Sequence, residues 1–512
     1  MVTIPRVVIA APGTGHGKTS VTTGLLGAFR NAGLTVSPHK VGPDYIDPGY
    51  HGLAAGRPGR NLDPWLVGED QIVPMFLHGA LTPVAADIAI VEGVMGLFDG
   101  KAGPAGSDPR DDFASTAHVA RLLAAPVVIV VDAGGMAASA AALLHGFVTF
   151  DPRVRLGGVI FNKVGTERHA QLLRDAAEAV GVPVLGVIRR NARLALPSRH
   201  LGLVPARELG GEAEAAVKAL ASVVADQVDL AAVLEVARSA GPLHAPSLIQ
   251  GPPATPQGPA ATPQGPAPTP PALPLTPHPS RPAPRVAVAA GPAFTFGYAE
   301  HPELLAAAGA EVVTFDPLRD EHLPAGVAGL VIGGGFPEEH AARLSANTRL
   351  RDEVAALARA GAPVIAECAG LLYLARSLDG HPMCGVLDAD AVMTGRLTLG
   401  YRDAVAVTAS PLGPAGTRVH GHEFHRTAIQ DPGSTDPGSA APQGAPAGGA
   451  GRAWRWQSFG GVVSEGFVRG GVHASYLHTH WNGIPGAAAR VTGAAGRYAR
   501  RPPGQQVGRW RQ

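Results

Sequence analysis

Short apolar runs alternate with longer stretches of helical periodicity along most of the chain. The runs are rich in Val and Ile and are bounded by Gly, Pro or Asp, as is typical of strands buried on both faces. Before residue 241 the predicted strands are Arg6–Ala10, Thr35–Pro38, Ile88–Glu92, Val127–Asp132, Gly158–Asn162 and Val184–Val187, with helices such as Lys18–Asn31 and Glu167–Val180 between them. After residue 284 further strands are predicted at Arg285–Ala289, Glu311–Phe315, Gly329–Gly333 and Pro363–Glu367. The pattern predicts two α/β domains, each built on a parallel sheet that helices cover.

A proline-rich segment, residues 241–284, separates the two regions. It holds 16 of the 48 prolines and one charged residue, Arg281. Because proline removes a backbone donor and favours an extended chain, we predict a semi-rigid linker; recognition by a proline-binding partner is the alternative. A second biased stretch, 430–452, predicts a mobile surface insertion, and residues 491–512 predict a basic, frayed tail. The predicted domains are therefore 1–240 and 285–490.

The composition of the chain excludes several classes of protein. With 46% hydrophobic residues in 512, the chain can bury sizeable cores, and a net charge of +1 offers no basic field for nucleic acid. No uninterrupted apolar run of about 18 residues predicts a membrane span, and the amino terminus lacks the pattern of a secretory signal. Two cysteines exclude a disulfide framework and favour a cytoplasmic location.

A glycine-rich turn, APGTGHGKT, lies between the first predicted strand and the first predicted helix. In this setting backbone N–H groups converge on an anion, so the turn predicts an ATP-binding loop rather than a chance run of glycine. Lys18 would reach the β- and γ-phosphates, and the Thr19 hydroxyl would bind Mg²⁺. The strict GxxxxGK[ST] pattern has glycine where this chain has Pro12. The remaining flexibility comes from Gly13, Gly15 and Gly17.

Acidic residues follow two of the predicted strands. Glu92 ends the strand Ile88–Glu92, at the edge where open α/β sheets bind ligands, and is a candidate Mg²⁺ ligand. Asp99 in EGVMGLFDG is a candidate substrate contact, and Asp132 is a weaker candidate at the next strand end. The alternative for each is an ordinary carboxylate at a strand end or turn.

The stretch HKVGPDYIDPGYH at 39–51 follows the second predicted strand. Lys40 would face the same edge as the phosphate loop and is assigned to the ATP site. Asp44 and Asp47 flank Tyr45, so this loop is a candidate to hold an organic substrate together with Mg²⁺, with Asp44 as a metal ligand. The alternative is a plain turn punctuated by Pro43 and Pro48.

The second region contains a candidate nucleophile. APVIAECAGLLYLA places Cys368 between an apolar strand and a helical run, as in a nucleophile elbow, where the helix N-terminus would lower the pKa of the thiol. Upstream, a predicted strand ends in the glycines of GLVIGGGFPEEH. The N–H groups of this glycine run, chiefly those of Gly334 and Gly335, would form an oxyanion hole. Downstream, HASYLHTHW offers three candidate bases: His473, His478 and His480. A buried structural cysteine is the alternative for Cys368, as we assign for Cys384, and a metal site is the alternative for the histidines.

Eight motifs in order resemble one enzyme family. They are APGTGHGKTSVTTGL, HKVGPDYIDPGYH, NLDPW, EGVMGLFDG, GGGFPEEH, AECAGLLYL, GHEFHR and SYLHTHW. Together they closely resemble the a,c-diamide synthases of cobalamin biosynthesis, which act on cobyrinate or hydrogenobyrinate. The resemblance implies an amino-terminal, ATP-dependent P-loop ligase domain similar to dethiobiotin synthetase and a carboxy-terminal class I glutamine amidotransferase domain.

Carried onto this chain, the resemblance implies that Cys368 is the glutaminase nucleophile and His478 its base. Class I glutaminases often show GxCxGxQ, and here Ala366 and Leu372 replace the first glycine and the glutamine. Many such enzymes carry a carboxylate two residues after the histidine. This chain has His480 there, so the third member of the triad is not assigned.

The resemblance also implies a mechanism. ATP, with Mg²⁺, would phosphorylate an acetate side chain of the corrinoid tetrapyrrole, and ammonia from glutamine would attack the acyl phosphate. Neither nucleic acid nor membrane is expected as a partner, and a homodimer is compatible with this interpretation. Three alternatives stay open: a cobyric acid synthase-like amidase of other corrinoid side chains, an amidase of a nickel tetrapyrrole, and a partitioning-type ATPase switch.

Overall fold

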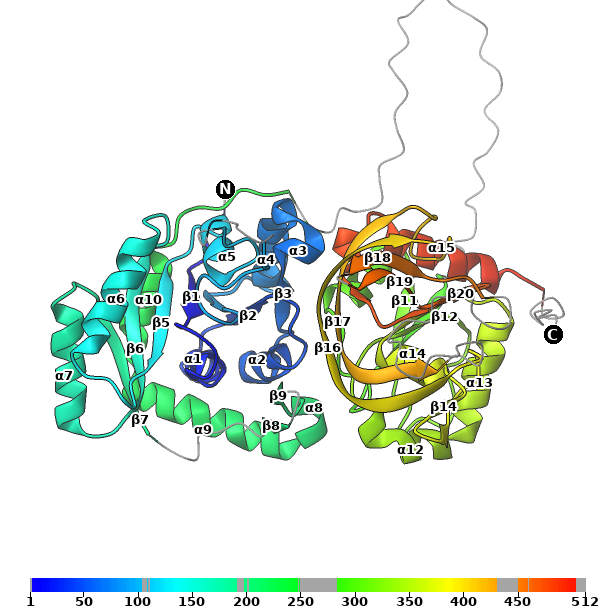
Figure 1. The fold of residues 1–512 in the computed structure, drawn as a ribbon, viewed down its shortest axis with the longest axis horizontal. Coiled ribbons are helices and arrows are strands. Elements are labelled where there is room, and N and C mark those ends of the chain that lie inside the picture. Colours follow the sequence, from blue (N-terminus) through cyan, green and yellow to red (C-terminus); the bar gives the residue numbers. More distant parts are fainter. Residues whose placement is uncertain are drawn as a thin grey trace, which may run out of the picture.

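The computed structural model describes residues 2–103, 108, 111–190, 198–199, 202–246, 248, 283–430, 450–458 and 460–502. Most of the predicted linker, most of the predicted insertion and the end of the predicted tail lie outside the described residues. Two α/β domains lie side by side, with the amino-terminal domain on the left in Figure 1. None of the helices among the described residues combines the length and the apolarity that a membrane span requires.

The first domain is built on a seven-stranded parallel sheet of order β3-β2-β4-β1-β5-β6-β7. Its strands are β1 Arg6–Ala10, β2 Val36–Val41, β3 Arg60–Leu62, β4 Ile88–Glu92, β5 Val127–Asp132, β6 Leu156–Val164 and β7 Val184–Arg189. The central strands are apolar and buried along almost their whole length, as the sequence predicts for a sheet covered on both faces. Burying each Val or Ile side chain stabilises the fold by about 1.5–3 kcal/mol relative to exposure.

Helices cover both faces of this sheet. They are α1 Lys18–Asn31, α2 Asp47–Ala55, α3 Pro64–Val67, α4 Ile72–Leu81, α5 Thr116–Leu122, α6 Ser139–Phe150, α7 Glu167–Glu178, α8 Ala206–Leu209, α9 Gly211–Gln227 and α10 Leu230–Arg238. In Figure 1, α1, α2 and α9 lie together below the sheet, and α4 and α5 lie above it. A short hairpin, β8 Ser198–Arg199 with β9 Gly202–Leu203, precedes α8.

The second domain contains a six-stranded sheet of order β11-β10-β12-β13-β21-β20, parallel except for the β20–β21 pair. The strands are β10 Arg285–Ala289, β11 Glu311–Phe315, β12 Val327–Ile332, β13 Val364–Glu367, β20 Phe467–Arg469 and β21 Val472–Ser475. Its helices are α11 Glu300–Ala307, α12 Ala341–Ala346, α13 Thr348–Arg359, α14 Ala369–Leu374 and α15 Ala487–Ala499. The four strands predicted after the linker are all present, which confirms an α/β fold for this domain.

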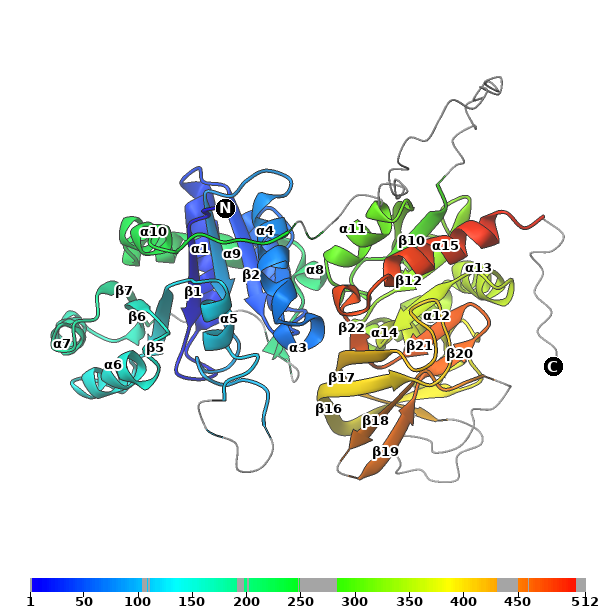
Figure 2. The same ribbon diagram turned by 90° about the horizontal axis from the view of Figure 1, so that it is seen from above.

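A second, largely antiparallel sheet was not predicted. It runs β15-β14-β16-β17-β22, with β18 and β19 attached to β16. The bounds are β14 Ser377–Leu378, β15 His381–Pro382, β16 Asp390–Ala406, β17 Arg418–Gln430, β18 Trp454–Ser458, β19 Gly461–Glu465 and β22 His478–Thr479. Figure 2 shows β16 and β17 on the side of the second domain that faces the first. This sheet brings β17 beside β22, where a predicted base lies.

The predicted tail begins too early. Residues 487–499 form α15, and Val491 and Ala495 are fully buried against the second domain. The start of the predicted tail is therefore part of a packed helix. Its small apolar residues recur at helical spacing and face the domain, while basic residues such as Arg497 lie on the other face. Only residues 503–512 of the predicted tail lie outside the described residues.

Candidate functional site

The glycine-rich turn lies between β1 and α1, as predicted, and two of its glycines need their residue type. Gly15 and Gly17 have φ of 89° and 91°, in the left-handed region that favours glycine. A Cβ on Gly17 would lie 2.3 Å from Nδ2 of Asn162. The left-handed backbone at both glycines, with the Asn162 side chain packed directly on Gly17, forms the tight turn that leads into the N-terminus of α1, where an anion can bind.

Lys18 folds back over this turn. Its Nζ donates hydrogen bonds to the carbonyl oxygens of Gly13 at 3.1 Å and Met95 at 2.5 Å. Burial lowers the pKa of Lys18 to about 8, the dominant cause being the loss of water around the ammonium. A phosphate bound at the turn would favour the charged form of Lys18 and so raise its pKa again.

A cluster of charged groups lies beside the turn. Nζ of Lys40 contacts Oδ2 of Asp47 at 2.8 Å and Oε1 of Glu92 at 2.9 Å. The Thr19 hydroxyl donates to Glu92 at 2.7 Å and to Asp47 at 3.2 Å, and Nε2 of His51 lies 2.7 Å from the second oxygen of Glu92. The structure thus brings together predicted residues from three separate motifs. His51 has no role in the sequence prediction, although it belongs to the quoted 39–51 motif.

The cluster holds the ionised form of Glu92. Burial alone would raise the pKa of Glu92, but the Lys40 ammonium and His51 outweigh it, so the pKa lies well below its ordinary value. For Lys40 the directions are opposite. Burial alone would lower the pKa of its ammonium, but the carboxylates of Asp47 and Glu92 outweigh burial and raise the pKa above its ordinary value. Asp47 is different: burial and the neighbouring Asp44 raise its pKa to about 7.

The remaining predicted acids lie in turns. Oδ1 of Asp44 accepts hydrogen bonds from the backbone N–H groups of Ile46 at 2.8 Å and Asp47 at 3.0 Å. Asp99 accepts from the N–H of Gly96 at 2.8 Å. In the structure Asp47, rather than Asp44, joins Thr19 and Glu92.

Asp132 pairs with Lys163 at 2.6 Å, a contact that the sequence analysis did not foresee. The described residues contain no cluster of three or more His, Cys, Asp or Glu side chains arranged to hold a metal ion. Oxygen groups from Thr19, Asp47 and Glu92 are nevertheless the donor set that Mg²⁺ accepts when phosphate oxygens complete its shell.

Cys368 lies at the predicted elbow between β13 and α14. Its φ is 49°, a strained value for a non-glycine residue and typical of a nucleophile presented on a sharp turn. Backbone N–H groups of Ala369 and Gly335 donate to the sulfur, and Sγ lies 3.9 Å from the carbonyl oxygen of Phe424. The N–H of Gly334 instead donates to the carbonyl of Phe296 at 2.9 Å, which removes Gly334 from the predicted pair of oxyanion donors.

The predicted lowering of the thiol pKa is wrong. Cys368 is only 3% exposed, and burial raises the pKa of its thiol above the ordinary value, with the Glu338 carboxylate as the next cause. The helix that follows, α14, has six residues, so its N-terminus offsets little of this burial. Cys384 is also buried, in agreement with a structural role.

The three candidate bases have different surroundings. Nδ1 of His473 lies 3.1 Å from the Ser410 hydroxyl, and Nε2 of His480 lies 3.5 Å from Glu300. His478 lies in β22, opposite His422 of β17. Nε2 of His478 is buried and has no hydrogen-bond partner among the residues that the structure describes. Nε2 of His480 also lacks a hydrogen-bond partner in the described part of the chain, but it lies against the Glu300 carboxylate, and no such carboxylate contact is seen there for His478.

Two buried carboxylates near this site, Glu367 and Glu465, accept hydrogen bonds from other residues. Glu367 accepts from the backbone and hydroxyl of Thr479 at 3.2 and 2.7 Å. Glu465 accepts from Ser475 and from the backbone of Tyr476, each at 2.7 Å. Burial raises the pKa of each carboxyl to about 7. Both carboxylates thus bind backbone and hydroxyl groups rather than His478, and neither is assigned as the third member of the triad.

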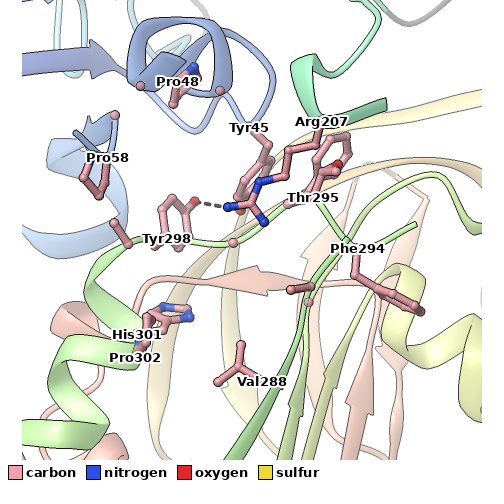
Figure 3. A pocket seen from close by; sticks show the side chains of 18 of the residues that line it. Tyr45, Pro48, Pro58, Arg207, Val288, Phe294, Thr295, Tyr298, His301 and Pro302 are labelled. Atoms are coloured by element: carbon pink, nitrogen blue, oxygen red, sulfur yellow. Dashed lines mark hydrogen bonds between the residues drawn. The ribbon is translucent and has the colours of Figure 1, made fainter. Parts of the chain in front are cut away.

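The two domains meet around the predicted substrate loop. Tyr45 packs into the hydrophobic core that continues through Phe296, Tyr298 and Phe336 of the second domain. Beside this contact lies a cavity of about 830 Å³ with walls from both domains. Figure 3 shows Tyr45 and Pro48 of the first domain opposite Tyr298 of the second, with Arg207 reaching between them.

Polar contacts reinforce the interface. Arg60 reaches Glu300 at 2.8 Å and Glu303 at 2.6 Å, and Tyr401 donates to Asp63 at 2.9 Å. Asp63 belongs to the NLDPW motif, for which the sequence offers no role; it also caps α3. The motif is therefore part of the contact between the domains.

Comparison with known proteins gives two family matches. Residues 7–204 match the CobQ/CobB/MinD/ParA nucleotide binding domain, and residues 285–485 match the CobB/CobQ-like glutamine amidotransferase domain. A hydrogenobyrinate a,c-diamide synthase of Streptomyces coelicolor is 58% identical over 95% of this chain and 96% of its own. One from Mycobacterium bovis is 54% identical over 96% of this chain and 98% of its own. A cobyrinate a,c-diamide synthase of Synechococcus is 40% identical over 94% of this chain and 96% of its own.

Proposed function

The chain belongs to the a,c-diamide synthase family of glutamine amidotransferases, and on this premise we propose how its two sites amidate a corrinoid. The substrate we propose is hydrogenobyrinate, with cobyrinate as the related alternative, because identity is higher to the relatives that carry the first name. The a- and c-acetate carboxylates would each become a carboxamide. The two family matches fit a reaction that depends on ATP and glutamine.

One observation carries this proposal. A single chain joins two kinds of site. The first domain carries a phosphate-type turn with Lys18, Thr19 and Glu92, and the second carries a strained thiol elbow at Cys368 together with the buried imidazole of His478. The first site suits phosphoryl transfer, and the second suits attack on an amide.

At the ligase site, a substrate carboxylate oxygen would attack the γ-phosphorus of ATP to give an acyl phosphate and ADP. Lys18 would neutralise charge on the transferred phosphoryl group, and Lys40 is held nearby by Asp47 and Glu92. Mg²⁺ would be held by the Thr19 hydroxyl and the carboxylates of Glu92 and Asp47, and would supply further charge neutralisation for the phosphates.

At the glutaminase site, the Cys368 sulfur would attack the side-chain amide carbon of glutamine. Nε2 of His478 would accept the thiol proton and return it to the departing nitrogen, so that ammonia leaves and a thioester forms. The Gly335 N–H would stabilise the oxyanion. Water then hydrolyses the thioester to glutamate, and ammonia attacks the acyl phosphate to give the amide and phosphate.

Two buried, unpaired cysteines are compatible with the reducing cytoplasm in which we place the reaction. The test is an assay of purified protein with hydrogenobyrinate and cobyrinate, ATP, Mg²⁺ and glutamine, followed by mass spectrometry. The expected product carries two carboxamides and forms only when ATP is present together with glutamine or ammonium. A protein that consumes ATP without amidating either corrinoid would contradict the proposal.

A further inference from the structure

Tyr45 belongs to the loop after β2 of the first domain, but its side chain packs against the second. Its ring is stacked on Phe296 with 5.2 Å between centroids and lies 4.8 Å from the imidazole of His478. Its hydroxyl donates to the Tyr298 hydroxyl at 2.7 Å, and the residue is only 9% exposed. The first domain thus forms one wall around the proposed glutaminase base.

Packing, rather than hydrogen bonding at Nε2, holds the imidazole of His478. That nitrogen has no partner among the described residues, and His480 two positions on is engaged with Glu300. A Cβ on Gly334 would lie 2.4 Å from Cε1 of His478, so backbone packs directly on the ring. Because a misplaced base loses proton-transfer efficiency, the groups that pack on this ring set its productive orientation.

The loop that carries Tyr45 is itself fixed by the ligase site. Asp44 accepts the backbone N–H of Asp47, and Asp47 contacts Lys40 at 2.8 Å. The position of the Tyr45 ring is therefore tied to the charged cluster of the first domain.

We propose that Tyr45 is a positioning residue for glutamine hydrolysis: the ligase domain supplies the ring that holds His478 in the orientation that activates Cys368. This role rests on the proposed function and is separate from the predicted contact of Tyr45 with the tetrapyrrole. It means that the glutaminase site is complete only when the first domain is docked.

The pH dependence of hydrolysis provides a readout that general destabilisation would not move. The titratable groups that act on His478 are His422 and His425 of β17, and the Tyr45 ring lies against its imidazole. The thiol of Cys368 is close enough to Tyr45 to act on the pKa of that residue. Burial lowers the pKa of His478 to about 3, and the two histidines add to this. Removing the Tyr45 ring admits water, so the pKa of His478 rises toward its ordinary value of about 6.5. Since only the neutral imidazole accepts a proton, the acid limb of the rate then moves to higher pH.

The experiment measures glutamine hydrolysis by the full chain across pH for wild type, Tyr45→Ala, Tyr45→Phe and Trp65→Ala. Trp65 is a matched control because it also crosses the interface, stacking on His420 with 3.8 Å between centroids. We expect kcat to fall by about tenfold or more in Tyr45→Ala, with KM for glutamine within about threefold, and the acid limb to move upward. Tyr45→Phe, which keeps the ring, and Trp65→Ala are expected to keep the wild-type pH profile.

A Tyr45→Ala variant that hydrolyses glutamine with the wild-type kcat and pH profile would overturn the inference. If this variant does not fold, Tyr45→Leu keeps apolar volume without the flat ring. The acid limb of its pH–rate profile should move upward by less than in Tyr45→Ala. An acid limb at the wild-type pH would overturn the inference equally. Failure of the proposed function looks different. In that case wild-type hydrolysis of glutamine would be absent or would persist in Cys368→Ala.

Discussion

Nζ of Lys40 lies 2.9 Å from Oε1 of Glu92, in a site where the two residues are 4% and 0% exposed. The pair joins β2 to β4 at the edge of the sheet where α1 begins. A buried ammonium and carboxylate are costly to separate, because whichever partner remains must stay charged without water. The phosphate site is therefore held together by charges that also stabilise the domain.

Glu92→Gln tests this arrangement. We expect it to lower the free energy of unfolding at pH 7 by about 3–5 kcal/mol, because Lys40 is left buried with one fewer counter-charge. The pKa of Glu92 is lowered in the fold, so its contribution is present above the unfolded pKa of about 4.3 and is lost as the pH falls through the folded value. The difference from wild type should shrink below about pH 4, as measured by urea unfolding. Asp226→Asn, an exposed carboxylate on α9, is the control and should change stability little.

Lys18→Ala should abolish amidation with either nitrogen source. The ammonium of Lys18 is buried over the turn, and its loss removes charge neutralisation worth about 100-fold or more in rate. Glutamine hydrolysis should survive in part, because Cys368 lies in the other domain. The measurement is ADP and amide formation with glutamine and with ammonium chloride. Lys218→Ala, on the exposed face of α9, is the matched control; full ligase activity in Lys18→Ala would remove the phosphate-site assignment.

Many helices and strands of the first domain could be predicted, because the residues that determine them are close together in the sequence. Each central strand is a short Val- and Ile-rich run closed by Gly, Pro or Asp, and β1, β4, β5 and α1 begin and end at the predicted residues. The gathering of Thr19, Lys40 and Glu92 also follows from topology, since the carboxyl ends of parallel strands share one edge of the sheet. His51, which the sequence analysis missed, could have been added by noting that it lies one helical turn after the predicted Asp47 in α2.

The contacts between the domains could not be predicted in this way. Nothing in the local pattern around Tyr45 or Arg60 names a partner some 240 or more positions away, such as Tyr298 or Glu300. The long strands β16 and β17 mix polar and apolar residues, because one face is partly open to solvent, so their runs resemble loops. The thiol pKa was mispredicted for a related reason: burial depends on distant segments, whereas the helix N-terminus is visible in the sequence.

Glu338→Gln should make Cys368 more acidic. The Glu338 carboxylate is the largest cause after burial of the raised thiol pKa, and its own pKa is raised by burial to about 7. Above pH 7 the carboxylate is therefore charged and opposes the thiolate. We expect alkylation of Cys368 by iodoacetamide in the variant to reach its midpoint at lower pH than in wild type. Glu339→Gln, on the exposed neighbour, is the control, and mass spectrometry separates Cys368 from Cys384.

Arg60→Ala should weaken the contact between the domains. Arg60 is 4% exposed and neutralises Glu300, which is 1% exposed. Burial alone would raise the pKa of Glu300, but His480 and Arg60 lower it, so removing Arg60 leaves a poorly compensated carboxylate. The expected loss is about 3–5 kcal/mol near neutral pH, and less in acid, where Glu300 can be protonated. Thermal unfolding measures this loss; Arg168→Ala, exposed on α7, should match wild type, and an unchanged Arg60→Ala variant would show that this ion pair does not hold the interface.

Cys368→Ser separates the two sites most sharply. It should eliminate glutamine-dependent amidation and spare amidation driven by high ammonium, because the thiol only generates ammonia while the acyl phosphate forms in the first domain. A serine hydroxyl is far less acidic than a thiol, so the imidazole of His478 cannot activate it comparably.

His478→Ala should behave like Cys368→Ser, whereas His480→Ala should be milder in its effect on hydrolysis, since its imidazole faces Glu300. The rates are compared with glutamine and with ammonium chloride at mildly alkaline pH, where more ammonia is unprotonated. A folded Cys368→Ser variant that loses both activities would show that the thiol does more than release ammonia. One that keeps glutamine-dependent amidation would remove Cys368 from the reaction, and with it the division of labour between the two domains.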